Sequence, residues 1–119
     1  MRAKYDRKGD ILSLFFQDVK GQRNTGIELN DNIVLYFNPD TEEALCLIII
    51  DYSKMIARTD SGERKAFSLS GLSELPLEIR ATVLRILKSP PVSEFLTVEE
   101  TYSGYVRRPS LQKVQAAIS

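Results

Sequence analysis

The first 51 residues consist of short apolar runs at strand spacing, separated by residues that favour turns. The clearest runs are residues 11–17, 33–37 and 44–50, and Gly, Asn, Asp or Pro residues precede each of them. Strand side chains alternate between two faces, so such runs form hairpins when the turns between them are short. The pattern predicts an α+β fold, with an antiparallel β-meander of four to five strands followed by C-terminal helices packed on the sheet.

The first turn aligns the apolar faces of its two strands. A four-residue loop places Tyr5 opposite Leu12, so that the two faces coincide. Gly9 is expected to supply the positive φ angle that such a loop needs. Asp6 and Asp10 flank the loop. Two carboxylates could form an acid–base dyad, but capping of backbone N–H groups is the favoured interpretation.

The second turn merges the remaining strands into a sheet with two apolar faces. A three-residue loop pairs Leu29 with Ile33, and Asn32 is expected in the left-handed region. One face, the core face, collects Leu12, Leu14, Phe16, Ile27, Leu29, Ile33, Leu35, Phe37, Leu45, Leu47 and Ile49. The opposite outer face is less polar than a solvated sheet face should be. It carries the candidate interface: Phe15, Val34, Tyr36, Ile48 and Ile50. Either the C-terminal segment or another chain is expected to cover it.

These residues resemble the domain-of-unknown-function 2283 family of small prokaryotic proteins over roughly the first 55 positions. The resemblance rests on Tyr5-Asp6, Asp10, the alternating Leu12, Leu14 and Phe16, residues 30–35 and 45–51, and Ser53. It implies a small antiparallel sheet followed by a short helix, and it carries over no activity, cofactor or catalytic residue. Some members are encoded beside small toxin-like genes, which implies an antitoxin or partner-binding role. In this chain Ile48 stands where the family often has an acidic residue, which makes the outer face more apolar.

A chain of 119 residues is expected to form a single domain, residues 1–119. We divide it into a family-like sheet module at 1–57, a loop at 58–72 and a helical C-terminal extension at 73–119. A stripe at helical spacing predicts a helix from Pro76 to Lys88; its members are Leu72, Leu75, Ile79, Val83, Ile86 and Leu87. A second short helix is predicted at 92–96 and a last one at 109–118. The pattern at 97–108 is ambiguous.

Composition excludes several kinds of chemistry. The chain has no histidine, which is the commonest general base and metal ligand. Its one cysteine, Cys46, lies in an apolar run and is interpreted as a buried structural thiol, since it has no histidine partner. We therefore expect no catalytic, cofactor-binding or metal-binding residue and no cofactor. No signal-peptide apolar region is visible and no run is long enough to span a bilayer, so a cytoplasmic location without membrane association is expected.

Charge argues against a general nucleic-acid binder. Sixteen basic and sixteen acidic residues balance to +0, although residues 1–51 carry −3 and residues 52–119 carry +3. Nucleic-acid-binding domains are usually strongly basic. A weak site of this kind would use Arg80, Arg85, Lys88, Arg107 and Arg108.

The favoured hypothesis is a protein–protein interaction or dimerisation module, with an antitoxin-like neutraliser as one form of it. The expected partner is a second copy of the chain, giving a homodimer, or a small protein. Alternatively, the C-terminal segments close the outer face within one chain and leave a monomer. A small-molecule enzyme without metal, histidine or cysteine chemistry is a further alternative. It is disfavoured because no residue pattern supports it.

Overall fold

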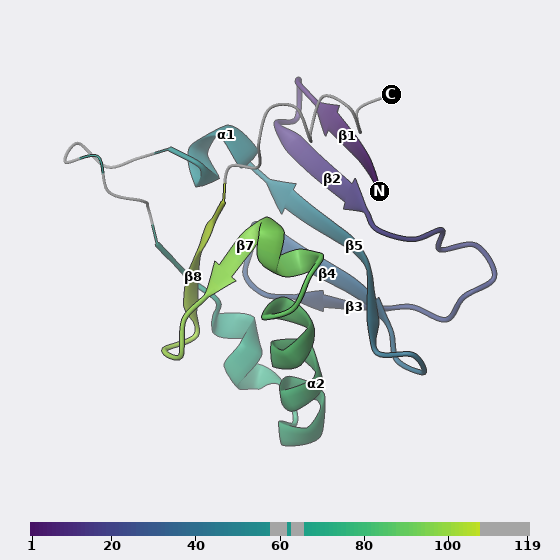
Figure 1. The fold of residues 1–119 in the computed structure, drawn as a ribbon. Coiled ribbons are helices and arrows are strands. Elements are labelled where there is room, and N and C mark those ends of the chain that lie inside the picture. The colour runs from purple at the N-terminus through teal and green to yellow at the C-terminus, as the bar shows by residue number, and fades with distance from the viewer. Residues whose placement is uncertain (58–61, 63–65, 108–119) are drawn as a thin grey trace.

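Five strands form one antiparallel sheet in the computed structural model, which describes residues 1–57, 62 and 66–107 (Figure 1). They are β1 (Arg2–Asp6), β2 (Ile11–Phe15), β3 (Thr25–Glu28), β4 (Ile33–Asn38) and β5 (Glu43–Ile50). The order is β1-β2-β5-β4-β3, so the predicted meander is wrong in one respect: β2 pairs with β5 and not with β3. β5 is the longest strand and is apolar from its second residue onward. Such a strand suits the central position, where neighbours on both edges bury it.

Both predicted hairpin registers are confirmed. In the second hairpin, the Leu29 N–H donates to the Ile33 carbonyl oxygen over 2.9 Å. The turn itself differs from the prediction, because Asn32 does not have a positive φ angle. Instead, Asn30 Oδ1 accepts the backbone N–H groups of Asn32 and Ile33, each over 2.8 Å. A side chain that closes the turn in this way removes the need for a left-handed residue.

The first turn also uses a different residue from the one predicted. Its left-handed residue is Asp10, with a φ angle of 54°, and Gly9 has no positive φ angle. Asp is one of the few residues other than glycine that visits this region readily, because its side chain can form local hydrogen bonds. Asp6 caps the turn as predicted, accepting the Lys8 N–H over 3.1 Å.

Asp10 links this turn to the start of α1 (Tyr52–Met55). Its carboxylate accepts the Tyr5 hydroxyl over 2.6 Å, the Ser53 hydroxyl over 2.5 Å and the Ser53 backbone N–H over 3.0 Å. N–H groups in the first turn of a helix lack intrahelical partners, so Asp10 supplies an acceptor from outside the helix. The hydrogen bonds from Ser53 and then Tyr5 lower the pKa of Asp10, and the bond to Asp10 raises the pKa of Tyr5.

Acid is expected to weaken this link. Because folding lowers the pKa of Asp10 below its ordinary value of 3.8, its contribution is complete above about pH 4 and is lost as the pH falls through the folded pKa. Asp10→Asn should therefore lower the free energy of unfolding at pH 7 relative to the parent chain. At pH 3 the difference in unfolding free energy between the two chains should be smaller. Urea unfolding at both pH values measures this. Tyr5→Phe, which removes one donor, should lose less stability, and an equal Asp10→Asn difference at both pH values would contradict the link.

A β-bulge interrupts the pairing of β4 with β5. Tyr36 lies opposite Cys46, but Phe37 lies opposite Ala44, so Leu45 has no partner across the ladder. An extra residue breaks strict alternation between faces. Leu45 is buried as predicted, yet it lies outside the main core cluster to which alternation had assigned it.

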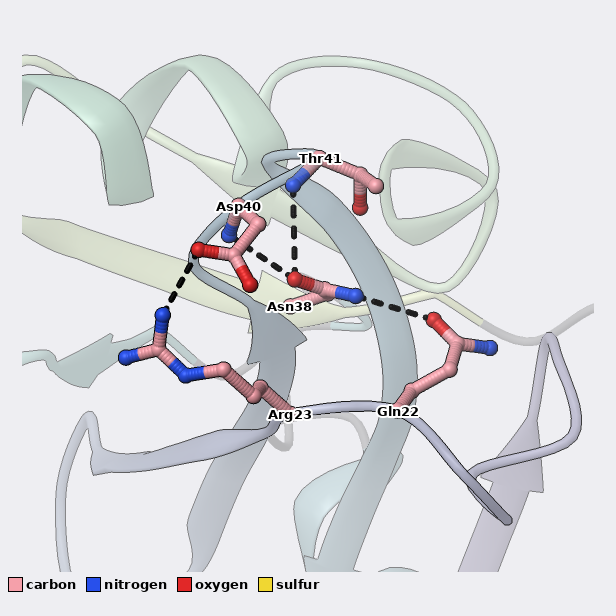
Figure 2. A network of polar contacts seen from close by, with 5 residues as sticks. All are labelled: Gln22, Arg23, Asn38, Asp40 and Thr41. Atoms are coloured by element: carbon pink, nitrogen blue, oxygen red, sulfur yellow. Dashed lines mark hydrogen bonds and ion pairs between the residues drawn. The ribbon is translucent and has the colours of Figure 1, made fainter.

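A buried asparagine organises the turn between these two strands (Figure 2). Asn38 is 6% exposed, and its Oδ1 accepts the N–H groups of Asp40 and Thr41 over 2.8 and 3.3 Å. Its Nδ2 donates to Gln22 Oε1 over 3.1 Å, and Arg23 pairs with Asp40 over 2.7 Å. The ion pair between Arg23 and Asp40 is exposed and contributes little to stability. The hydrogen bonds of the Asn38 side-chain amide matter more, because they satisfy a buried polar group. The network joins the loop before β3 to the β4–β5 turn.

The C-terminal half contains a second sheet, so the prediction of a helical extension at 73–119 is wrong in part. Its antiparallel strands are β6 (Phe67–Ser68), β7 (Leu96–Val98) and β8 (Ser103–Val106), in the order β6-β8-β7. The other elements are η1 (Ser70–Glu74), α2 (Leu77–Leu87) and η2 (Val92–Glu94). The β7–β8 hairpin occupies the region where the sequence was ambiguous, and its turn contains Tyr102 at a φ angle of 56°.

The predicted helix is confirmed as α2, and it packs on the core face of the first sheet. Val83, Ile86 and Leu87 share one buried cluster with core-face residues such as Leu35. The prediction that Ile79 belongs to the buried stripe of this helix is wrong, because Ile79 is 42% exposed. It lies beside an open groove of about 360 Å³. The predicted helix at 109–118 lies outside the described residues. No helix within the described residues is long and apolar enough to cross a membrane.

Candidate interaction surface

The strand register brings all five candidate interface residues onto the outer face. Directly opposite residues of antiparallel strands point to the same face. Across β2, β5 and β4, the first row is Phe15, Cys46 and Tyr36, and the second row is Ser13, Ile48 and Val34. The third row contains Ile11 and Ile50. The rows are contiguous, so the face is an apolar surface about three strands wide.

The described C-terminal half packs on the other side of the sheet. Every buried apolar side chain of residues 66–107 belongs to the core cluster, which also contains Leu14 and Leu47 of the core face. None of the five candidate residues belongs to this cluster or to the partly buried side chains packed against it. Figure 1 shows α2 and β7 on one side of the five-stranded sheet. The candidate residues are each partly exposed, so residues 66–107 do not supply the expected cover.

The two rings of the first row, those of Phe15 and Tyr36, each lie beside a residue of an edge strand, so we call this row the aromatic row. The Arg2 guanidinium carbon lies 4.6 Å from the centroid of the Phe15 ring. At the other end, a Cβ on Gly26 would come within 2.8 Å of the Tyr36 ring, so the missing side chain makes room for that ring. Between them, Cys46 is 4% exposed, and burial raises its pKa to about 11. The prediction that Cys46 is buried is confirmed.

Opposite charges lie at the two ends of the second row. Lys4 of β1 is opposite Ser13, and Glu28 of β3 is opposite Val34. Both charged side chains are exposed, and neither forms an ion pair within the described residues. Sequence reasoning missed the relation between Lys4 and Glu28, because it depends on how β2 and β4 flank β5.

The cations proposed for a weak nucleic-acid site are mostly engaged within the chain. The Arg80 guanidinium donates to two backbone carbonyls over 2.9 and 2.8 Å. Arg85 forms an ion pair with Glu42, and Arg107 donates to the Ser93 carbonyl over 3.0 Å. Lys88 is exposed, and Arg108 lies outside the described residues. These contacts leave the described arginines less free to bind phosphate.

A hollow at the end of α2, the acidic hollow, is lined by charged side chains that are bound to other side chains of the chain. It has a volume of about 360 Å³ and is lined by Glu42, Glu43 and Arg85, among others. Arg85 binds Glu42, and Gln17 Nε2 donates to Glu43 Oε2 over 2.8 Å. Within the part of the chain that the structure describes, no three His, Cys, Asp or Glu side chains are grouped so as to hold a metal ion.

Relatives give no further guide to this surface. Comparison with family models, curated proteins and solved structures finds no match. The resemblance to the domain-of-unknown-function 2283 family therefore stays a prediction made from the residues.

Proposed function

We propose that this chain is a protein-interaction module that forms a homodimer through the outer face of its five-stranded sheet. The proposal rests on the contiguous, mainly apolar rows around Ile48. No buried side chain of residues 66–107 packs against these rows. Apolar surfaces of this kind, rimmed by charge, mark sites of protein contact. A two-fold interface needs only one self-complementary patch, because both copies use the same residues.

An antitoxin-like neutraliser of a small protein is a second form of the same proposal. It is supported by the resemblance to a family in which some members are encoded beside small toxin-like genes. In that form the small protein would occupy the outer face in place of the second copy. The rival activities named from the sequence have less support, because the described arginines and the acidic hollow are largely paired internally.

Ile48→Glu is expected to dissociate the dimer. The change would bury a carboxylate of each copy in an apolar contact, which costs several kcal/mol, so the dissociation constant should rise roughly a hundredfold or more. Light scattering at micromolar concentration measures the mass. We expect twice 13.5 kDa for the parent chain and 13.5 kDa for the variant.

Leu77→Glu is the matched control, because Leu77 is 75% exposed on α2 and lies away from the outer face. It should remain dimeric. Circular dichroism should show that both variants keep the fold, since Ile48 is partly exposed in the single chain. A parent mass of 13.5 kDa would refute the homodimer, and an unchanged Ile48→Glu dimer would move the interface elsewhere.

A further inference from the structure

The charges on the outer face are placed so that one chain cannot pair them. The second row runs, one residue per strand, through Lys4, Ser13, Ile48, Val34 and Glu28. Lys4 and Glu28 therefore stand on the two edge strands, with Ile48 at the midpoint. Four strand spacings separate them, which amounts to about 19 Å. An ion pair requires 4 Å or less, so Lys4 and Glu28 of one chain cannot pair with each other, and an ion pair between these two positions has to join two copies.

We infer that the partner is a second copy related by a two-fold axis that runs parallel to β5 and passes close to Ile48. This inference rests on the proposed function, because it assumes that the outer face is the interface. Such an axis exchanges the two edges of the sheet, so that β1 of one copy lies over β3 of the other. Lys4 then lies over the partner's Glu28, and Glu28 lies over the partner's Lys4. The apolar centre and both charged ends are complementary at once.

The charges distinguish this axis from the other simple face-to-face arrangement. A two-fold axis perpendicular to the strands would lay β1 over β1 and β3 over β3. Lys4 would then face Lys4, and Glu28 would face Glu28, which is destabilising. Both axes keep the strands of the two sheets nearly aligned, so the charges decide between them. Aligned sheets crossing at about 30° are a common way for two sheets to pack.

The aromatic row fits the same arrangement. Exchanging the edges places Arg2 of one copy over Gly26 of the other, where no side chain rises from β3 and the Tyr36 ring fills the space. Arg2 already lies against one aromatic ring, that of Phe15, at 4.6 Å. A guanidinium near an aromatic face is attracted by the electrons of the ring. The edge that carries the cation therefore meets an edge that offers an aromatic surface.

A charge exchange tests the axis directly. Lys4→Glu and Glu28→Lys should each raise the dissociation constant of the homodimer roughly tenfold at low ionic strength, because two attractive pairs become repulsive. The double variant Lys4→Glu/Glu28→Lys should return to within about twofold of the parent value, since it restores both pairs. An equimolar mixture of the two single variants should form a heterodimer with near-parental affinity. Analytical ultracentrifugation measures all four, and 1 M salt should reduce the differences.

The outcomes separate this inference from the proposed function. Weaker homodimers of both single variants, together with recovery in the mixture, support the axis, because about an axis perpendicular to the strands each single variant would keep the same number of like-charge pairs as the parent chain. If Ile48→Glu dissociates the dimer but the single charge variants bind as tightly as the parent chain, the outer face remains the interface and the axis is wrong. Failure of the mixture to recover would also overturn the axis. A parent chain that is monomeric would overturn both proposals.

Discussion

Replacing Gly71 with alanine is expected to lower the free energy of unfolding by roughly 2–4 kcal/mol. A Cβ at this position would lie 1.9 Å from the Glu28 carbonyl oxygen and 3.1 Å from the Leu29 carbonyl oxygen. Both are backbone atoms at the end of β3, so they cannot rotate aside. The Gly71 N–H also donates to the Leu29 carbonyl over 2.9 Å. Relieving the clash by moving η1 would therefore break the bond that fastens η1 to the sheet.

Gly9→Ala is the matched control for this substitution. A Cβ on Gly9 would come within 2.9 Å of Asp6 Oδ2, which is the end of a flexible side chain. Since that carboxylate can turn away, the loss should stay below about 1 kcal/mol. Urea denaturation of the three chains measures the differences. Equal losses for the two alanine variants would show that close packing of η1 against β3 is not what Gly71 provides.

Leu87→Ala is expected to cost about 2–5 kcal/mol of unfolding free energy. Leu87 is fully buried on the face of α2 that packs into the core cluster with Val83 and Ile86. Shortening it leaves a cavity that its closely packed neighbours fill only in part. The same substitution at Leu77, which is 75% exposed on the same helix, should change stability by less than about 0.5 kcal/mol.

The comparison of the two leucines tests whether α2 is part of the sheet's core. Thermal unfolding followed by circular dichroism should give one cooperative transition that moves to lower temperature in Leu87→Ala and stays in place in Leu77→Ala. If Leu87→Ala left the transition of the sheet unchanged, α2 would be folding independently. Ile79, which the helical stripe also marks as buried, is a poorer probe because it is 42% exposed.

Local features of the fold could be predicted, and non-local ones could not. Loops of three and four residues determine hairpin register almost by geometry, and the pairing of Leu29 with Ile33 follows from them. The pairing of β2 with β5 had no such signal, because 27 residues of chain lie between Phe15 and Glu43. The second sheet was missed because β6 has two residues and β7 has three, too few to show alternation.

The candidate surface divides in the same way. Its apolar members, such as Val34 and Ile48, could be found because alternation assigns each one to a face within its own strand. Its charged members could not, because the relation of Lys4 to Glu28 exists only after four strand pairings are known. Nor does alternation indicate that the Tyr36 ring lies over Gly26.

The central position of β5 also determines when this sheet can form during synthesis. The β1–β2 and β3–β4 hairpins are complete before β5 emerges, yet neither pairs with the other. At about 5–20 residues per second, roughly 2–7 s pass between the synthesis of Phe15 and that of Ile50. During that interval the edge of β2 that will later face β5 is open to other chains, and the edge of β4 joins it once Asn38 has been made. Until β5 has left the ribosome, the two hairpins therefore have no strand between them to join them.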